Sequence, residues 1–255
     1  MNVFDAVILS VVEGLTEFLP ISSTGHLILA SSLLGLPDSE FLKSFEIIIQ
    51  SGAIAAVIAL YWKSFFDVEI LKRLVVAFIP TAVIGLLLYS TIKTYLLGSE
   101  QLVVWTLLLG GIALIAFEYF HHETDSATGA VSAISYTQSV LIGLFQSIAM
   151  IPGISRSGAT IIGGLALGLK RKTIVEFSFL LAVPTMLAAT GLDLLKNYST
   201  FSSDQAMSLS IGFVLSFVVA AASIMWLLRF VQSHSFISFG IYRIALGLIF
   251  LFFVF

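Results

Sequence analysis

The chain has 255 residues, of which 58% are hydrophobic and only 11% are charged, and its formal net charge is −3. Soluble domains are about 45–50% apolar and about 25% charged, so this composition excludes a soluble globular protein, because there are too few charges to cover its surface. The absence of cysteine excludes disulfides, thiolate metal sites and cysteine nucleophiles, and no basic cluster indicates nucleic acid as a partner. The mean hydropathy of +1.07 instead predicts an integral membrane protein surrounded by membrane lipids.

The first half of the chain opens on an interrupted apolar region. Residues 1–5 lack the positive n-region of a signal peptide, so we expect this N-terminus to be retained. Residues 2–36 are apolar but broken at 20–25 by Pro, Ser, Thr and Gly, which leaves two arms that are short for crossing a bilayer. Broken backbone at membrane depth must be buried in protein or line a wet cavity, so we predict a re-entrant helix–loop–helix hairpin. Three segments of spanning length follow, at 44–62, 71–92 and 102–120.

The second half repeats this order. Residues 137–169 are apolar but broken at 151–158, and spanning segments follow at 173–195, 209–230 and 238–255. The predicted fold is all-α and integral to the membrane. It has two repeats, about 1–120 and about 130–255, each with one re-entrant hairpin and three transmembrane helices. The total is six spanning helices and four half-helices in a single membrane domain.

The distribution of basic residues predicts the orientation. If each hairpin enters and leaves on one side, three crossings per repeat place the two repeats in inverted orientation. The loops at 63–73, 121–136, 170–172 and 231–237 then share one face. That face carries Lys63, Lys72, Arg73, Lys170, Arg171, Lys172 and Arg229, and the other carries Lys43, Lys93 and Lys196. The positive-inside rule makes the first face cytoplasmic and places both termini outside.

Two carboxylates precede the first break. Glu13 and Glu17 are four residues apart and share a helix face, where like charges repel. An ionised residue at mid-helix in a bilayer costs about 2.5–3.5 kcal/mol on insertion scales. A divalent cation, a proton or a basic partner between them explains the pair, and oxygen ligands suit Mg²⁺ or Ca²⁺. The alternative is a solvated pair at the membrane interface.

Hydroxyl residues and a histidine begin the second arm of the first hairpin. Ser22, Ser23 and Thr24 stand where an N-cap is expected, and a helix N-terminus is an anion site. One of them is needed as the cap, and three exceed that need. His26 lies in the first turn, where it is a candidate general acid or base or a nucleophile toward phosphorus; the alternative is a packed side chain.

The second break contributes a cation. Arg156 lies in a stretch rich in glycine and hydroxyls, and its planar fork suits phosphate; the alternative is a structural ion pair with Glu13 or Glu17. Ser155, Ser157 and Thr160 add hydrogen-bond donors. Gln146 aligns with Glu17 in the repeat, so the acids come from the first hairpin and the arginine from the second. Arg243, within an apolar helix, either snorkels outward or supports the site from behind.

Together these residues indicate a phosphate-handling site. They comprise two acids for a metal, a hydroxyl-rich helix N-terminus, a histidine and an arginine. A substrate with a phosphate head and a long apolar tail would reach such a site laterally from the bilayer. The residues alone therefore predict a lipid-phosphate hydrolase.

The two motifs, residues 13–26 and 152–160, closely resemble the signature stretches of bacterial undecaprenyl-diphosphate phosphatase, the integral-membrane phosphatase linked to bacitracin resistance. The resemblance implies hydrolysis of undecaprenyl diphosphate to undecaprenyl phosphate and inorganic phosphate, which recycles the lipid carrier of cell-wall synthesis. It also implies a divalent cation and a location in the bacterial cytoplasmic (inner) membrane, with the site open toward the outer, periplasmic side. A homodimer is a further expectation.

The resemblance also implies roles for individual residues. Glu13 and Glu17 would serve as metal ligands and in acid–base chemistry, and Ser23 and His26 would be the nucleophile and its partner. Thr24 and Ser155 would hold phosphate, and Arg156 would clamp the diphosphate. From their residue types alone, we add Ser22, Ser157 and Thr160 to the predicted phosphate ligands. Whether Ser23, His26 or a water attacks is open at this point.

The alternative from another class is a secondary transporter or lipid flippase on the same scaffold. In that case Arg156 would be a substrate counter-ion and Glu17 a proton carrier. The clustering of Ser23, His26 and two acids favours the hydrolase, because transport alone does not need it.

Overall fold

The computed structural model describes residues 1–96, 99–123, 127–197 and 206–253, and these residues fold into helices with one isolated backbone bridge, between Thr128 and Leu169. In chain order the α-helices are α1 (Val3–Thr16), α2 (Ser23–Leu33), α3 (Glu40–Leu60), α4 (Val68–Thr91), α5 (Glu100–Phe120), α6 (Tyr136–Ile148), α7 (Arg156–Ala166), α8 (Arg171–Asn197), α9 (Ala206–Phe230) and α10 (Ile237–Phe253). Short helices lie between them at η1 (Trp62–Phe66), η2 (Ile92–Leu96) and η3 (Val131–Ala133). The prediction of an all-α protein is confirmed.

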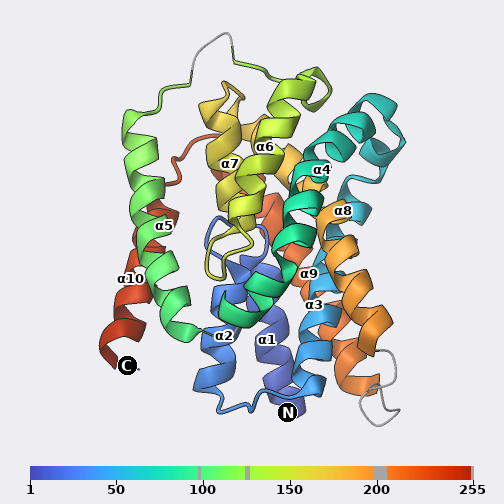
Figure 1. The fold of residues 1–255 in the computed structure, drawn as a ribbon, viewed down its shortest axis with the longest axis vertical. Coiled ribbons are helices and arrows are strands. Elements are labelled where there is room, and N and C mark those ends of the chain that lie inside the picture. The colour runs from blue at the N-terminus through green and yellow to red at the C-terminus, as the bar shows by residue number, and fades with distance from the viewer. Residues whose placement is uncertain (97–98, 124–126, 198–205, 254–255) are drawn as a thin grey trace.

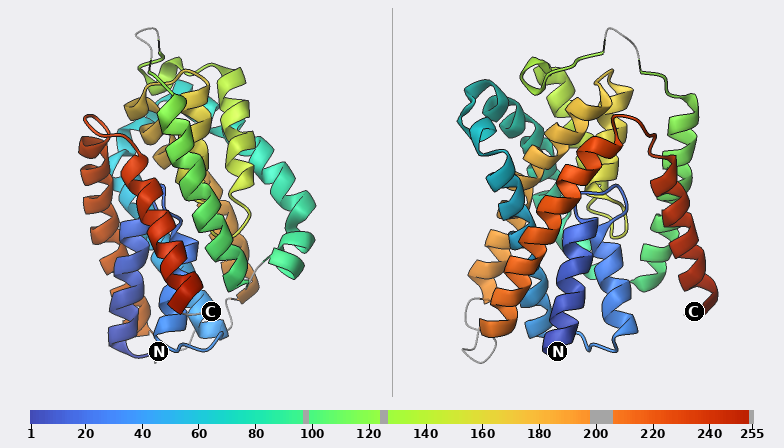
Figure 2. Two further views of the ribbon diagram at one scale, coloured as in Figure 1. Left: turned by 90° about the vertical axis from the view of Figure 1, so that its left-hand side faces the viewer. Right: turned by 180° about the vertical axis from the view of Figure 1, so that it is seen from behind.

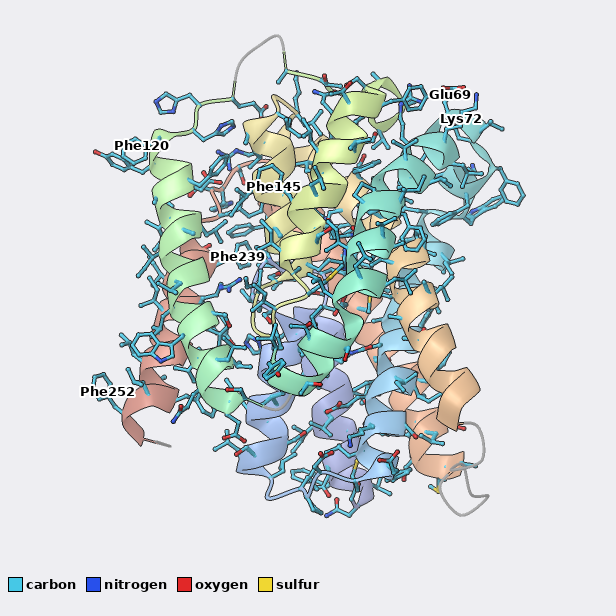
Figure 3. The ribbon with its side chains drawn as sticks, in the orientation of Figure 1. Glu69, Lys72, Phe120, Phe145, Phe239 and Phe252 are labelled. Atoms are coloured by element: carbon cyan, nitrogen blue, oxygen red, sulfur yellow. The ribbon has the colours of Figure 1, made fainter. Side chains whose placement is uncertain are left out.

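Five of these helices are long and apolar enough to cross a membrane, namely α3, α4, α5, α8 and α9. The sixth predicted span corresponds to α10, which is apolar but shorter. Apolar side chains also cover the outside of the molecule. Phe120 and Phe252 project outward from α5 and α10, with exposed fractions of 79% and 72%, whereas Phe239 lies inward at 6% (Figure 3). The chain is therefore a multi-pass integral membrane protein.

The two interrupted regions form helix–break–helix pairs that enter the molecule from opposite ends. In Figure 1, α1 and α2 rise from the lower end, and α6 and α7 descend from the upper end. The breaks at 17–22 and 149–155 meet near the middle of the molecule, and Figure 2 shows the same arrangement from two further sides. The first long helix after each pair, α3 and α8, starts from the end at which its pair entered.

Close helix crossings hold these pairs in place. The α1 helix packs against α9, and α6 packs against α4. Gly14 on α1 lies against the backbone of Ser216, and Gly143 on α6 lies against the backbone of Ala77. A side chain at either glycine would collide with that backbone, so both crossings depend on the missing Cβ.

Candidate active site

The two breaks contact each other through backbone and hydroxyl groups. Ser157 donates its hydroxyl to the carbonyl of Leu19 at 2.7 Å, and the Ser155 hydroxyl lies 3.3 Å from the same carbonyl. Residues predicted to meet from opposite halves of the chain are thus neighbours.

The second arm of each pair begins in the same way. Ser22 caps α2 by accepting a hydrogen bond from the Gly25 amide at 3.3 Å, and Ser155 caps α7 by accepting one from Gly158 at 3.0 Å. Both helices have 11 residues. The first helical residue after the cap is Ser23 in one arm and Arg156 in the other, so the two arms present different chemistry at equivalent positions.

Glu17 binds both of these first residues. Arg156 donates from Nη2 to Glu17 Oε1 at 3.0 Å, and Ser23 donates its hydroxyl to Oε2 at 2.5 Å. The Glu17 and Arg156 side chains are only 7% and 12% exposed, so the pair is screened from solvent. The predicted alternative of a resting ion pair between Arg156 and Glu17 is therefore present, and it also brings Ser23 to a carboxylate.

Arg156 has two further contacts. Its Nη1 donates to the carbonyl of Ser178 on α8 at 2.8 Å, and the guanidinium lies 5.8 Å from the centre of the Phe18 ring. The Nε atom has no partner in the described residues. The guanidinium of Arg156 is therefore fixed in position, and its Nε–H remains as a donor without a partner in the part of the chain that the structure describes.

Ser22 adopts a strained backbone conformation at this site. Its φ of 72° is the one positive value among the described residues other than glycine, and such conformations persist where the surroundings hold them. His26 supplies part of this support, because its Nδ1 donates to the Ser22 carbonyl at 2.7 Å. A carbonyl only accepts, so the proton is on Nδ1 and a neutral ring presents Nε2 as an acceptor. Nε2 lies 2.8 Å from the Tyr242 hydroxyl of α10, which therefore donates.

These contacts place His26 differently from the predicted partnership with Ser23. Among the described residues, His26 bonds to Ser22 and Tyr242, and Ser23 bonds to Glu17. The residue in contact with the Ser23 hydroxyl is thus a carboxylate.

Glu13 lies behind Glu17 on α1. It is completely buried, and neither of its side-chain oxygens has a hydrogen-bond partner in the described part of the chain. It lies one helical turn before Glu17, on the same face of α1. Unpartnered buried carboxylate oxygens fit a hard divalent cation, although the described residues contain no cluster of three or more His, Asp or Glu ligands. Such an ion would take its remaining ligands from water and substrate phosphate, as Mg²⁺ usually does.

The other predicted phosphate ligands divide into two groups. Thr24 is exposed and Ser155 is buried, and both line a cavity of about 260 Å³ together with Glu17, Ser22, Ser23 and Arg156. Ser157 and Thr160 are completely buried and do not line it. Thr160 instead bonds to the Ser178 hydroxyl at 2.7 Å, so these two hydroxyls support the loop.

Arg243 joins the two breaks from α10. It is 3% exposed, and its guanidinium donates to the carbonyls of Pro20 at 3.3 Å and Gly153 at 3.0 Å, one in each break. It also donates to Thr106 and Leu107 of α5 at 2.9 and 3.4 Å. The snorkelling alternative is therefore wrong, and the inward, supporting alternative is confirmed.

Several residues of the site were missed from the sequence. Tyr242 directly precedes Arg243 in the sequence, and this proximity is the one signal that could have pointed to it. Ser178 contributes a backbone carbonyl, for which no sequence signal exists. Glu46 of α3 is half-buried, although solvation is expected of a charged residue near the end of an apolar segment.

Residues 6–249 match the family described as bacitracin resistance protein BacA. A protein from Persephonella marina is 53% identical over 255 residues, which cover 100% of both chains. Proteins from Sulfurihydrogenibium sp. and Aquifex aeolicus are 52% and 51% identical, and each match covers 98% of this chain and 98% of the relative. All three relatives are named undecaprenyl-diphosphatase.

Proposed function

The chain belongs to the bacitracin resistance protein BacA family, and we infer that it hydrolyses undecaprenyl diphosphate to undecaprenyl phosphate and inorganic phosphate. It is an integral-membrane phosphatase whose substrate is a prenyl diphosphate lipid. The observation that carries this function is the binding of Ser23 and Arg156 to the two oxygens of one buried carboxylate, Glu17. In this proposal Ser23 is the nucleophile, Glu17 is the base and Arg156 is the cation that binds phosphate. Their mutual contacts at one cavity wall support these roles. The comparisons give no support to the transporter or flippase alternative.

The chain's own residues suggest the following order of events. The terminal phosphate binds at the N-terminus of α2, where the helix dipole and free amides favour an anion. Arg156 turns one nitrogen from Glu17 to the phosphate, which leaves Glu17 free to accept the Ser23 proton. The Ser23 oxygen then bonds to the terminal phosphorus, and the bond from that phosphorus to the bridging oxygen breaks. Undecaprenyl phosphate leaves, and water hydrolyses the phosphoserine to release inorganic phosphate.

The remaining site residues hold this geometry in the proposed mechanism. His26 fixes the Ser22 carbonyl, which keeps the turn that aims Ser23 at Glu17. Arg243 fixes the distance between the two breaks through Pro20 and Gly153. A divalent cation held by Glu13 and Glu17, Mg²⁺ or Ca²⁺, would supply charge neutralisation for the diphosphate.

The finer architecture is part of the same proposal. We take residues 1–120 and 130–255 as inverted repeats with re-entrant hairpins. Supporting this, α1 packs on α9 as α6 packs on α4, and α3 packs on α9 as α8 packs on α4. The α5–α10 crossing is reciprocal, because a Cβ on Gly111 would meet the Gly240 carbonyl and a Cβ on Gly240 would meet the Gly111 carbonyl.

The proposed location is the bacterial inner membrane, with the site open to the periplasmic side. Supporting this, Lys72 lies at the end of the molecule opposite both termini (Figure 3). The connections from α3 to α4 and from α7 to α8, which carry Lys63 and Lys170, lie at the same end (Figure 1). The side chains of Lys93 and Lys196 lie outside the described residues. Since the chain has no native cysteine, single cysteines introduced at Lys172 and Lys196 test the orientation, and labelling of Lys172→Cys by an impermeant reagent from outside would overturn it. The homodimer remains a prediction, tested by light scattering of the purified protein.

The direct test of function is phosphate release from a long-chain prenyl diphosphate by the purified protein. We expect release that stops in chelator and returns with added Mg²⁺ or Ca²⁺. Rapid quenching and mass spectrometry should find phosphate on Ser23, and the Ser23→Ala variant should lack it. Turnover by Ser23→Ala at the parent rate would exclude Ser23 as the nucleophile, and no release by the parent protein would refute the function.

A further inference from the structure

Gln146 occupies, in the second helix–break–helix pair, the place that Glu17 occupies in the first. Each follows by three residues the glycine at its helix crossing, Gly143 and Gly14. Gln146 is 2% exposed and lines the same cavity as Glu17 and Arg156. The cavity thus has a charged part from the first pair and Arg156, and a neutral part around Gln146.

The hydrogen bonds of Gln146 leave one end of its amide unused. Its Nε2 lies 2.8 Å from the Thr81 hydroxyl of α4 and 3.1 Å from the Thr185 hydroxyl of α8. Those hydroxyls donate to the carbonyls of Gly143 at 2.9 Å and Leu181 at 2.8 Å. The Gln146 Oε1 atom is buried and has no partner in the described residues.

This amide can be turned into a donor if the two threonine hydroxyls leave the Gly143 and Leu181 carbonyls, which keep their intrahelical bonds. If its two ends exchange, both threonine hydroxyls can rotate to donate to Oε1, and Nε2 gains two free N–H groups. An anion beside Gln146 would favour that arrangement. A carboxylate at the same position, as in the first pair, would instead repel the anion.

The apolar lining of the cavity indicates where a prenyl chain would lie. On α8, Ala189 lines the cavity, lies one helical turn beyond Thr185 and is exposed. Met150 and Met186 line the cavity and are half-buried. The lining thus passes from buried Gln146 to the apolar outer surface.

We propose that Gln146, with Thr81 and Thr185, forms a neutral subsite for the phosphate that stays on the prenyl alcohol. This inference rests on the proposed function. The terminal phosphate would sit at Ser23 and Arg156, the retained phosphate at Gln146, and the first isoprene units against Met150 and Met186. The product then keeps one of the two phosphate contacts of the substrate.

The test compares the binding of two probes, farnesyl monophosphate and inorganic phosphate, by calorimetry in detergent at fixed Mg²⁺. Gln146→Met keeps the length without the amide, and Gln146→Glu keeps the shape with a charge. Both should bind farnesyl monophosphate about tenfold or more weakly, because a hydrogen bond to a charged group contributes about 1.5–3 kcal/mol. Inorganic phosphate should bind to them as to the parent. Arg156→Met should show the reverse pattern, with weaker binding of inorganic phosphate and parent-like binding of farnesyl monophosphate.

The matched control is Gln232→Met, since Gln232 is exposed and its side-chain amide bonds to the Leu228 carbonyl at 3.0 Å. Thr185→Val provides a second variant if Gln146→Met folds poorly, and it should also weaken the binding of farnesyl monophosphate. Parent-like binding of farnesyl monophosphate by Gln146→Met and Thr185→Val would overturn the subsite. That result is distinguishable from failure of the proposed function, which is absence of phosphate release by the parent protein.

Discussion

Glu17 and Arg156 are 139 positions apart in the chain and form a buried ion pair at 3.0 Å. The pair joins the two breaks at the point where Ser23 also meets Glu17. Neither break alone holds both the acid and the cation, so the site exists only when the two halves are packed together. A buried charge left without its partner is costly. The pair therefore contributes to the stability of the fold as well as to the proposed chemistry.

Replacing Arg156 with lysine should lower kcat/KM by about 10³-fold, a typical loss for an arginine that stabilises a transferring phosphoryl group. Lysine keeps the charge but not the planar fork that reaches Glu17 and the Ser178 carbonyl together. Steady-state phosphate release measures the effect. Arg229→Lys, at an exposed position of α9, is the matched control and should behave as the parent. Near-normal turnover by a folded Arg156→Lys would contradict the assignment.

Glu13→Gln should raise the Mg²⁺ concentration needed for half-maximal activity by about tenfold or more. The change keeps the shape of the side chain and removes the charge of two buried oxygens that have no partner in the described residues. A metal titration of phosphate release, together with calorimetric Mg²⁺ binding, measures the shift. Glu40→Gln is a suitable control, because Glu40 is exposed and forms an ion pair with the exposed Lys43. Unchanged Mg²⁺ binding in Glu13→Gln would remove Glu13 from the metal site.

The main elements of the fold could be predicted because lipid imposes strict rules on a sequence. Spanning helices appear as long apolar runs, and a polar break such as 20–25 stands out against them. Arg156 was recognisable for the same reason, since a guanidinium in an apolar region needs an anionic partner. Glu17 was one of two carboxylates that could fill this role, and the structure selects it.

The details of the site depend on packing that no local pattern encodes. The contact of His26 with Tyr242 joins residues 216 positions apart and depends on how α10 docks. Ser157 and Thr160 have the same residue types as Ser22 and Thr24, yet their hydroxyls face protein groups and not the cavity. The side of the helix N-terminus on which a hydroxyl lies decides its role, and that side is set by the loop geometry.

His26→Asn should keep activity within about tenfold of the parent, whereas His26→Ala should lose about 100-fold or more. The asparagine amide occupies the place of Nδ1 and can still donate to the Ser22 carbonyl, which supports the strained turn. Phosphate release by the two purified variants is compared. If His26 transferred protons, asparagine and alanine would be equally inactive, so equal loss would refute the anchoring role.

Arg243→Met should destabilise the protein by about 2–6 kcal/mol, since it removes the donor to the buried loop carbonyls of Pro20 and Gly153 and each unsatisfied group costs about 1–3 kcal/mol. Gly110→Ala should act in the same direction, because its Cβ would collide with the Arg243 guanidinium. Thermal unfolding in detergent, followed by intrinsic fluorescence, measures both. Activity well below the unfolding temperature should also fall, since Pro20 and Gly153 lose their common donor. Parent-like stability of Arg243→Met would show that these bonds contribute little.

Alanine at Gly14 and at Gly143 should each destabilise the fold by about 1–3 kcal/mol, a typical cost of overpacking. At Gly14 the new Cβ would lie 2.8 Å from the Ser216 carbonyl oxygen, and at Gly143 it would collide with that of Ala77. Gly191→Ala is the control, because nothing lies within 4 Å of its Cβ position and alanine favours helix over glycine. Inverted repeats require that Gly14 and Gly143 serve equivalent crossings, so both variants should lower the unfolding temperature to a similar degree. A fold that tolerates alanine at one of them and not at the other would argue against that equivalence.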